Sequence, residues 1–295
     1  MATDRDADFH ASLRVLYLSW RDQDNPEAGG AEVFAERTAQ ALTERGHRVT
    51  IFSSRFRGAA RRTRHRDVDI VRGGGKFSCY LQGMVYVLRH QKDFDIVLDV
   101  QNGVPFWTPL VTRTPVVNLT HHVHRDLWWA VFPRVVATAG WFAESRVAPW
   151  VYRNCRYVTV SRSTRTDLTE LGVDAARVDL VYCGNDHPRD LASFDRVPRS
   201  ADPRIIVLGR LVPHKQVEMA IDVVADLDAD LPTLSLDIVG TGYWEPELRQ
   251  YARDRGVGDR VRFHGFVDDD TKHLLLSQAW VMVMPSHKEG WGLII

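Results

Sequence analysis

The stretch LRVLYLSW-RDQDNPEAGG-AEVFAERTAQALTERGH-RVTIF, residues 13–52, determines the class of fold. Residues 13–20 form an apolar, β-branched and aromatic run, which is typical of a strand buried on both faces. Residues 31–46 place small and apolar side chains on one helical stripe, and Gly46 suits a helix C-terminus. A second apolar run at 47–52 completes a strand–helix–strand unit, which predicts a mostly parallel sheet.

The same alternation continues along the chain in two series. In the first series, strands are predicted at 68–71, 95–100, 115–121, 157–161 and 178–182, and helices at 77–90 and 162–171. In the second, strands are predicted at 204–209, 234–240, 261–266 and 280–286, and helices near 216–228, 245–255 and 271–278. The segment between the series is rich in Pro, Asp and Ser, which favours a linker.

We therefore predict an α/β chain with two Rossmann-like domains. The expected boundaries are a disordered tail at 1–12, a first domain at 13–184, a linker at 185–203 and a second domain at 204–295. The second domain is short for its kind, and EGWGLII at the C-terminus resembles the start of a helix. We expect this second domain to be incomplete.

Composition excludes several classes of protein. The 295 residues include 38 basic and 38 acidic side chains, a balance that argues against a nucleic-acid binder. The three cysteines lie far apart, which excludes a disulfide scaffold and a cysteine-based zinc site. No apolar run reaches the length of a membrane span, and the polar N-terminus has no signal-peptide core. We expect a cytoplasmic globular protein.

Two loops after predicted strands carry features of anion sites, since ligands of open parallel sheets bind at that edge. Gly29 and Gly30 precede a helix, whose first backbone amides could face an anion. A plain helix entry is the alternative. Arg210 and Lys215 follow the strand at 204–209 and could together neutralise a diphosphate. A solvated basic loop is the alternative for this second motif.

Two further loops carry other chemistry. PSHKEGWGL (285–293) combines glycines with the carboxylate of Glu289, which suits sugar hydroxyls better than phosphate. His121, His122 and His124 follow the strand at 115–121, where alternate side chains point to opposite faces, so a three-histidine metal site is disfavoured. A single imidazole that donates a hydrogen bond is a better interpretation. A structural role remains open for at least two of the three histidines.

Taken together, these motifs resemble the GT-B retaining glycosyltransferases of family 4. The resemblance follows the chain in order through Gly29-Gly30-Ala31-Glu32, His121, VSRSTRTDL (160–168), VYCGND (181–186), GRLVPHK (209–215), IVGTG (238–242), FHGFV (263–267) and PSHKEGWGL (285–293). It implies two Rossmann-like domains that face each other across a cleft. It also implies a nucleotide-diphosphate sugar as donor substrate, no metal and no cofactor.

The resemblance implies a role for particular residues. Arg210 and Lys215 would hold the diphosphate, assisted by the Gly30 amide beside Gly29. Glu289 would bind sugar hydroxyls, and His121 would be the active-site histidine, with His122 as the alternative. The remaining expected donor contacts are Gly240, Val267, Gly290, Trp291, Gly292 and Leu293.

The family pairs Glu289 with a second glutamate eight residues later, a position beyond Ile295. We therefore expect weak donor binding and little turnover from this chain. A sugar-nucleotide epimerase and a non-catalytic nucleotide-sugar binding module are the alternatives. A nicotinamide-dependent enzyme is disfavoured because the GxGxxG fingerprint is absent.

The acceptor side of the sequence is aromatic and basic. Five tryptophans fall between residues 107 and 150, which could receive a hydrophobic or lipid acceptor or contact a membrane at its inner face. A helix pair in the domain core is the alternative. RFRGAARRTRHR (55–66) could likewise meet anionic headgroups, and a solvated loop is its more common fate.

Overall fold

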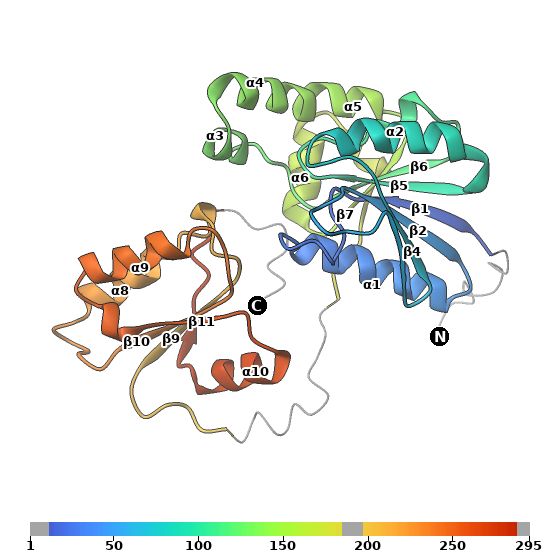
Figure 1. Cartoon of the computed structure of the whole chain (residues 1–295). Coiled ribbons are helices and arrows are strands. Elements are labelled where there is room, and N and C mark those ends of the chain that lie inside the picture. Colours follow the sequence, from blue (N-terminus) through green and yellow to red (C-terminus); the bar gives the residue numbers. More distant parts are fainter. Residues whose placement is uncertain (1–11, 185–196, 288–295) are drawn as a thin grey trace, which may run out of the picture. The chain divides into compact units, whose positions relative to one another are not determined.

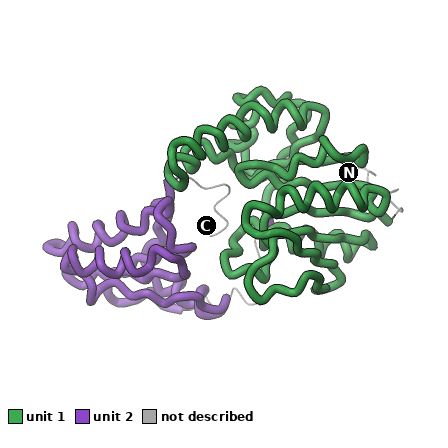
Figure 2. The backbone as a smooth tube through the Cα atoms, turned by 45° about the horizontal axis from the view of Figure 1, so that its top comes forward, with its two compact units in different colours: residues 1–183 green, residues 184–295 purple. Residues whose placement is uncertain are grey.

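The computed structural model describes residues 12–184 and 197–287. The chain divides into two compact units, residues 1–183 and residues 184–295 (Figure 2). Nearly all of the expected tail and most of the expected linker lie outside the described residues. Each unit is described by itself below.

Unit 1 is built on an eight-stranded sheet with the order β3-β4-β2-β1-β5-β6-β7-β8. The strands are β1 (Arg14–Leu18), β2 (Arg48–Ser53), β3 (Arg62–His65), β4 (Val68–Arg72), β5 (Ile96–Gln101), β6 (Val116–Thr120), β7 (Arg156–Thr159) and β8 (Val178–Leu180). All neighbours are parallel except β3 and β4. The near-continuous apolar strands are buried on both faces, as a parallel sheet requires.

Helices cover both faces of this sheet (Figure 1). They are α1 (Gly30–Glu44), α2 (Ser78–His90), α3 (Leu127–Val131), α4 (Arg134–Phe142), a π-helical turn (Ala143–Val147), α5 (Ala148–Val151) and α6 (Arg162–Glu170). Alternation along β1 separates the two faces. Val15 and Tyr17 belong to the cluster under α1, whereas Leu16 and Leu18 belong to the cluster under α2.

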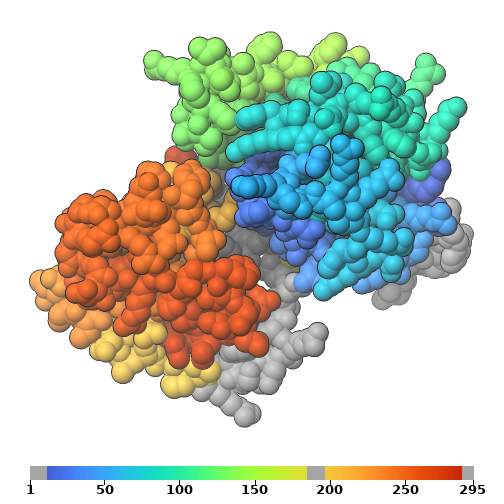
Figure 3. All heavy atoms as spheres, viewed as in Figure 1, coloured from blue at the N-terminus to red at the C-terminus, as the bar shows by residue number. Residues whose placement is uncertain are grey.

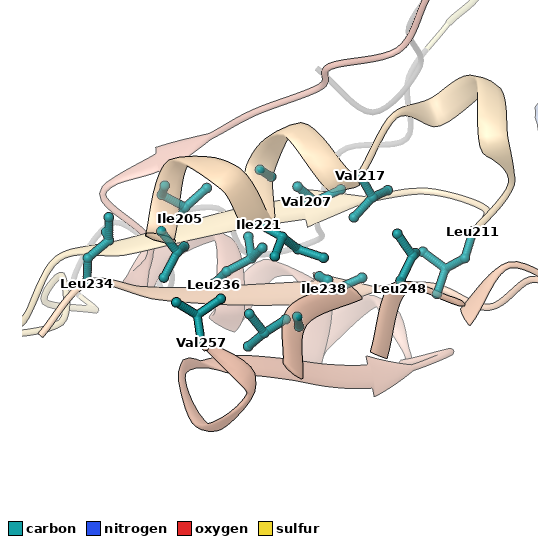
Figure 4. Packing of buried hydrophobic residues seen from close by; sticks show 14 residues of the cluster. Ile205, Val207, Leu211, Val217, Ile221, Leu234, Leu236, Ile238, Leu248 and Val257 are labelled. Carbon is teal, nitrogen blue, oxygen red and sulfur yellow. The ribbon is translucent and has the colours of Figure 1, made fainter. Parts of the chain in front are cut away.

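Unit 2 has a four-stranded parallel sheet with the order β11-β10-β9-β12. Its elements are β9 (Arg204–Leu208), α8 (Glu218–Asp226), β10 (Ser235–Val239), α9 (Glu245–Asp254), β11 (Val261–Gly265), α10 (Asp269–Gln278) and β12 (Val281–Met282). Side chains of β9 and β10 pack with Ile221 of α8 and Leu248 of α9 (Figure 4). Leu275 of α10 packs on the opposite face, against Ile206.

The α/β class and the parallel sheets are confirmed. The interpretation of 55–66 as a solvated loop is wrong for its second half, because Arg62–His65 form β3 and pair antiparallel with β4. An edge strand leaves its charged side chains in water, so a basic sequence can still form a strand there. The strand predicted at 280–286 is also shorter than expected, since β12 contains two residues.

Candidate functional site

Glycines bring the strand-end loops of unit 2 into contact. Gly209 has φ +150° and donates its amide to the Val239 carbonyl at 3.0 Å. Gly240 has φ +131°, donates to the Gly265 carbonyl at 2.8 Å, and lies so close that a Cβ would collide with the Gly209 carbonyl oxygen. Only glycine fits this position, because it combines a left-handed φ with backbone contact. The loops after β9, β10 and β11 therefore form one connected edge.

Arg210 and Lys215 line the same recess at this edge. Its walls are Val207, Leu208, Gly209, Arg210, Lys215, Val217, Met284, Pro285 and Ser286. Lys215 ends a single 3₁₀ turn, Pro213–Lys215, and the His287 amide donates to the His214 carbonyl at 2.9 Å. The turn thereby ties the loop after β9 to the loop after β12.

The recess also contains an unpaired hydroxyl. Ser286 Oγ is buried and has no hydrogen-bond partner among residues 12–184 and 197–287. A buried polar atom without a partner costs free energy, so a ligand that bonds to it would recover that cost. Two cations and this hydroxyl in one recess suit an anionic ligand with several oxygen atoms.

Of the other residues expected to contact the donor, some lie within the described residues and some lie outside them. Val267 follows β11 and is half-buried against the cluster around Leu208, next to Asp268, which caps α10 by accepting from the Thr271 amide at 2.7 Å. Glu289, Gly290, Trp291, Gly292 and Leu293 lie outside the described residues.

In unit 1, a buried ion pair shapes the loop that leads to Gly29 and Gly30. The Arg72 guanidinium donates to both carboxylate oxygens of Asp22, at 2.7 and 2.8 Å, and Ser53 Oγ donates to the same carboxylate. Both charged side chains are 1% exposed. The two charges compensate each other and are hydrogen-bonded, as a buried pair must be. The ion pair joins the loop after β1 to β4.

At the start of α1, one of the two backbone amides expected to bind an anion is hydrogen-bonded within the protein. Gly29 is the N-cap, and its amide donates to Glu32 Oε2 at 2.7 Å in a capping-box arrangement. Glu32 is 6% exposed. Of the two expected glycine donors, Gly29 is therefore bonded internally, whereas Gly30 begins the first helical turn.

His121 sits at the end of β6 in a buried environment. Its carbonyl accepts from Thr164 Oγ1 at 2.9 Å, and its ring packs edge-to-face on Phe34 with 5.2 Å between centroids. Its Nε2 is buried and has no hydrogen-bond partner within the described part of the chain. Burial, assisted by the nearby His124, lowers the pKa of His121 to about 4. The imidazole is therefore neutral near pH 7.

The other two histidines belong to a different cluster. The rings of His122 and His124 stack with 4.1 Å between centroids. Glu144 accepts from the His124 amide at 3.0 Å and from Trp128 Nε1 at 2.6 Å. Glu144 is fully buried within the π-helical turn. Sequence reasoning missed Glu144, because nothing local distinguishes an acid within an aromatic segment from a surface carboxylate.

Acidic side chains in the described residues do not gather into metal sites. No group of three His, Cys, Asp or Glu there could hold a metal ion. Three of the Asp-x-Asp strings in the sequence, at residues 67–69, 93–95 and 226–228, pair with basic side chains. The pairs are Asp67 and Asp69 with Arg64, Asp93 with His90, Asp95 with Arg14, Asp226 with Arg255 and Asp228 with Arg260. These strings therefore serve as surface charge pairs.

Comparisons with known proteins place this chain among glycosyltransferases. Residues 28–189 match the family described as Glycosyltransferase Family 4, and residues 189–295 match Glycosyl transferases group 1. A glycogen synthase of Mycobacterium tuberculosis is 32% identical over 150 residues, which cover 50% of this chain and 36% of that protein. The match thus spans little more than a third of the length of that curated relative.

Solved structures show the same fold. Sucrose-phosphate synthase from Thermosynechococcus elongatus has a TM-score of 0.75 at 17% identity, covering 96% of this chain and 77% of that one. The Anabaena protein HepE, solved in complex with UDP, has a TM-score of 0.61 at 17% identity, covering 94% and 75%. The fold is therefore that of the GT-B glycosyltransferases. Because the family match covers more than half of the chain, this protein belongs to Glycosyltransferase Family 4.

Proposed function

We propose that this chain transfers a sugar from a nucleotide-diphosphate sugar to an acceptor hydroxyl, with retention at the anomeric carbon and without a metal. The observation that carries the proposal is the recess of unit 2, which Arg210 and Lys215 line together with Gly209 and Ser286. The diphosphate leaves with additional negative charge, and fixed cations stabilise that charge most in the transition state. Membership of Glycosyltransferase Family 4 supports the assignment.

The proposed reaction needs no protein nucleophile. The acceptor oxygen attacks the anomeric carbon on the face from which the diphosphate departs, so one C–O bond forms as the other breaks. A diphosphate oxygen accepts the proton of the acceptor hydroxyl. Arg210 and Lys215 hold the departing diphosphate, in the role that a divalent ion has in other transferases.

The remaining site residues take supporting roles in this proposal. His121 is neutral near pH 7 because its pKa is low. Its Nε2, which is unbonded within the described residues, offers a hydrogen bond to a substrate hydroxyl. Gly30 offers a backbone amide to the diphosphate. The resemblance to family 4 further assigns donor contacts to Val267, Gly240 and the segment 289–293.

For the acceptor we propose a hydrophobic or lipid-linked molecule, used at the cytoplasmic face of a membrane. Exposed aromatic side chains of residues 127–150 support this choice, among them Trp129 and Trp150. Transfer of labelled sugar into an organic extract of the reaction tests the proposal. Label that stays in the aqueous phase on a polar acceptor would contradict it.

Calorimetric titration with UDP, GDP and ADP tests the donor site. We expect one nucleotide to bind equally well with and without EDTA. Arg210→Ala and Lys215→Ala should each weaken binding at least tenfold, about 1.4 kcal/mol, because each removes a charge-assisted contact. Arg249→Ala is the matched control, since Arg249 lies on α9 and pairs with Glu245. Binding that needs a metal, or that survives both substitutions, would refute the proposed site.

A further inference from the structure

Helix α2 is apolar on both sides. Its inner side packs on the sheet, where Val87 is fully buried and Gly83 lies so close to Phe106 that a Cβ would press on that ring. Four large apolar side chains on the outer side are between 36% and 67% exposed: Phe77, Leu81, Val85 and Leu88. Their spacing places them on one helical stripe. A helix on a water-exposed surface normally presents polar residues to the solvent. The exposed stripe of α2 is instead apolar.

A second exposed apolar surface lies on the α3–α5 segment. Four of its side chains are between 60% and 82% exposed: Val131, Val135, Phe142 and Trp150. Figure 1 places α4, α5 and α2 over the same side of the sheet, opposite α1. Tyr152, directly after α5, donates to Asp99, which also accepts from the Phe106 amide near α2. The two apolar groups therefore belong to segments over the same face of the sheet of unit 1, and Figure 3 shows atoms of both segments at the molecular surface.

The exposed charges of these segments are mostly basic, and the exposed acids nearest to them are Asp93 after α2 and Asp126 before α3. Helix α2 contains no acidic residue, and Lys76 and Arg89 lie at its two ends. In residues 127–153 the only acidic side chain is Glu144, which is buried and bonded to His124 and Trp128. The exposed charges of that segment are Arg134, Arg146 and Arg153. Arg89, Arg134 and Arg146 form no ion pair with any of the residues described by the structure.

We propose that this apolar–basic surface docks onto an anionic phospholipid membrane. The surface is defined by Phe77, Leu81, Val85, Leu88, Val131, Val135, Phe142 and Trp150, together with Lys76, Arg89, Arg134, Arg146 and Arg153. Apolar side chains enter the headgroup boundary, tryptophan suits that boundary, and arginines meet lipid phosphates. A second copy of this chain would oppose arginines to arginines, so charge favours a lipid surface over self-association.

The proposal does not depend on the proposed sugar transfer, because membrane docking requires neither donor nor acceptor. In the described part of the chain no helix is long and apolar enough to span a bilayer. Docking through this surface would place unit 1 on a membrane.

Vesicle sedimentation tests the proposal with the 295-residue chain. We expect at least tenfold stronger association with vesicles of 7:3 phosphatidylcholine and phosphatidylglycerol than with phosphatidylcholine alone, and weaker association at high salt. The double variant Leu81→Glu/Val135→Glu and the double variant Arg134→Ala/Arg146→Ala should each lose at least tenfold in affinity.

The control variant is Met219→Glu/Val223→Glu, which changes two apolar side chains of α8 that are 53% and 41% exposed. It should bind vesicles as the unaltered chain does. Circular dichroism verifies that the variants fold. The proposal is overturned by equal binding to both vesicles, by no binding, or by surface variants that bind like the control. A dimer that Leu81→Glu/Val135→Glu dissociates, without vesicle binding, would assign the surface to self-association instead.

Discussion

At the scale of single residues, two of the buried polar side-chain atoms that have no partner in the described part of the chain lie just after strands. His121 Nε2 and Ser286 Oγ are both buried and unbonded among the described residues. Most buried polar groups in folded proteins have partners, so each exception needs an explanation. His121 follows a parallel strand and Ser286 a strand of the other sheet, at the edge where such sheets bind ligands. Under the proposed function, both atoms would bond to a substrate.

The low pKa of His121 makes a prediction about stability. The folded pKa of about 4 lies below the ordinary value of 6.5. The contribution of His121 to the free energy of unfolding is therefore fully present above pH 6.5 and is lost as the pH falls toward 4. Between pH 7.5 and pH 5 this group should cost the chain about 2 kcal/mol of unfolding free energy. Urea unfolding of the unaltered chain and of His121→Gln at both pH values measures it.

The difference between the two proteins isolates His121 from the other titrating groups. His121→Gln should lose about 2 kcal/mol less than the unaltered chain on acidification. Equal losses in both proteins would mean that His121 is accessible enough to protonate within the fold.

At the scale of elements, two local irregularities shape the loops that follow the strands. The glycines of unit 2 let the loops after β9 and β10 touch, and the π-helical turn of unit 1 turns Glu144 inward to His124 and Trp128. A π-helical turn inside a helix is rare and often lies near a functional site. Gly140 next to this turn provides space for the Trp128 ring, since a Cβ there would collide with it. The loop after β6 is thus held by a buried carboxylate and by close packing.

Substitution of Gly240 tests the loop contact. Gly240→Ala should cost at least about 3 kcal/mol of stability, because it adds a left-handed φ penalty to a collision with the Gly209 carbonyl. Gly256→Ala is the matched control, since Gly256 has φ +73° with open space around it, and should cost about 1 kcal/mol. Chemical unfolding measures both. Similar costs for the two variants would show that the loops separate without strain.

At the scale of the whole molecule, ligand binding should distinguish the two units. A nucleotide at one hundred times its dissociation constant should stabilise the structure that binds it by about 2.7 kcal/mol. We expect hydrogen exchange to slow at residues 209–217 and 284–287, because these segments line the recess. Strand β3, at the edge of the sheet of unit 1 opposite β8, serves as the internal reference. Protection that appears only in unit 1 would place the nucleotide elsewhere.

The sequence by itself determined the alternation of strands and helices, the parallel class of both sheets and the position of Arg210 and Lys215 after a strand. These follow from short-range patterns, because strands buried on both faces read as continuous apolar runs, whereas burial in helices repeats every third or fourth residue. The same reasoning could not find β3, since an edge strand is stabilised by its neighbour β4 and needs no apolar pattern of its own.

Only the tertiary structure decided which distant residues meet. Ser286 joins Arg210 because β12 lies beside β9, and Glu144 meets His124 because the π-helical turn packs behind the loop after β6. The strand order also places α2 and α4 on one side of unit 1, which creates the apolar–basic surface from two separate segments. Local patterns report how a residue prefers to be buried, whereas its partners depend on the order of strands, which no local pattern contains.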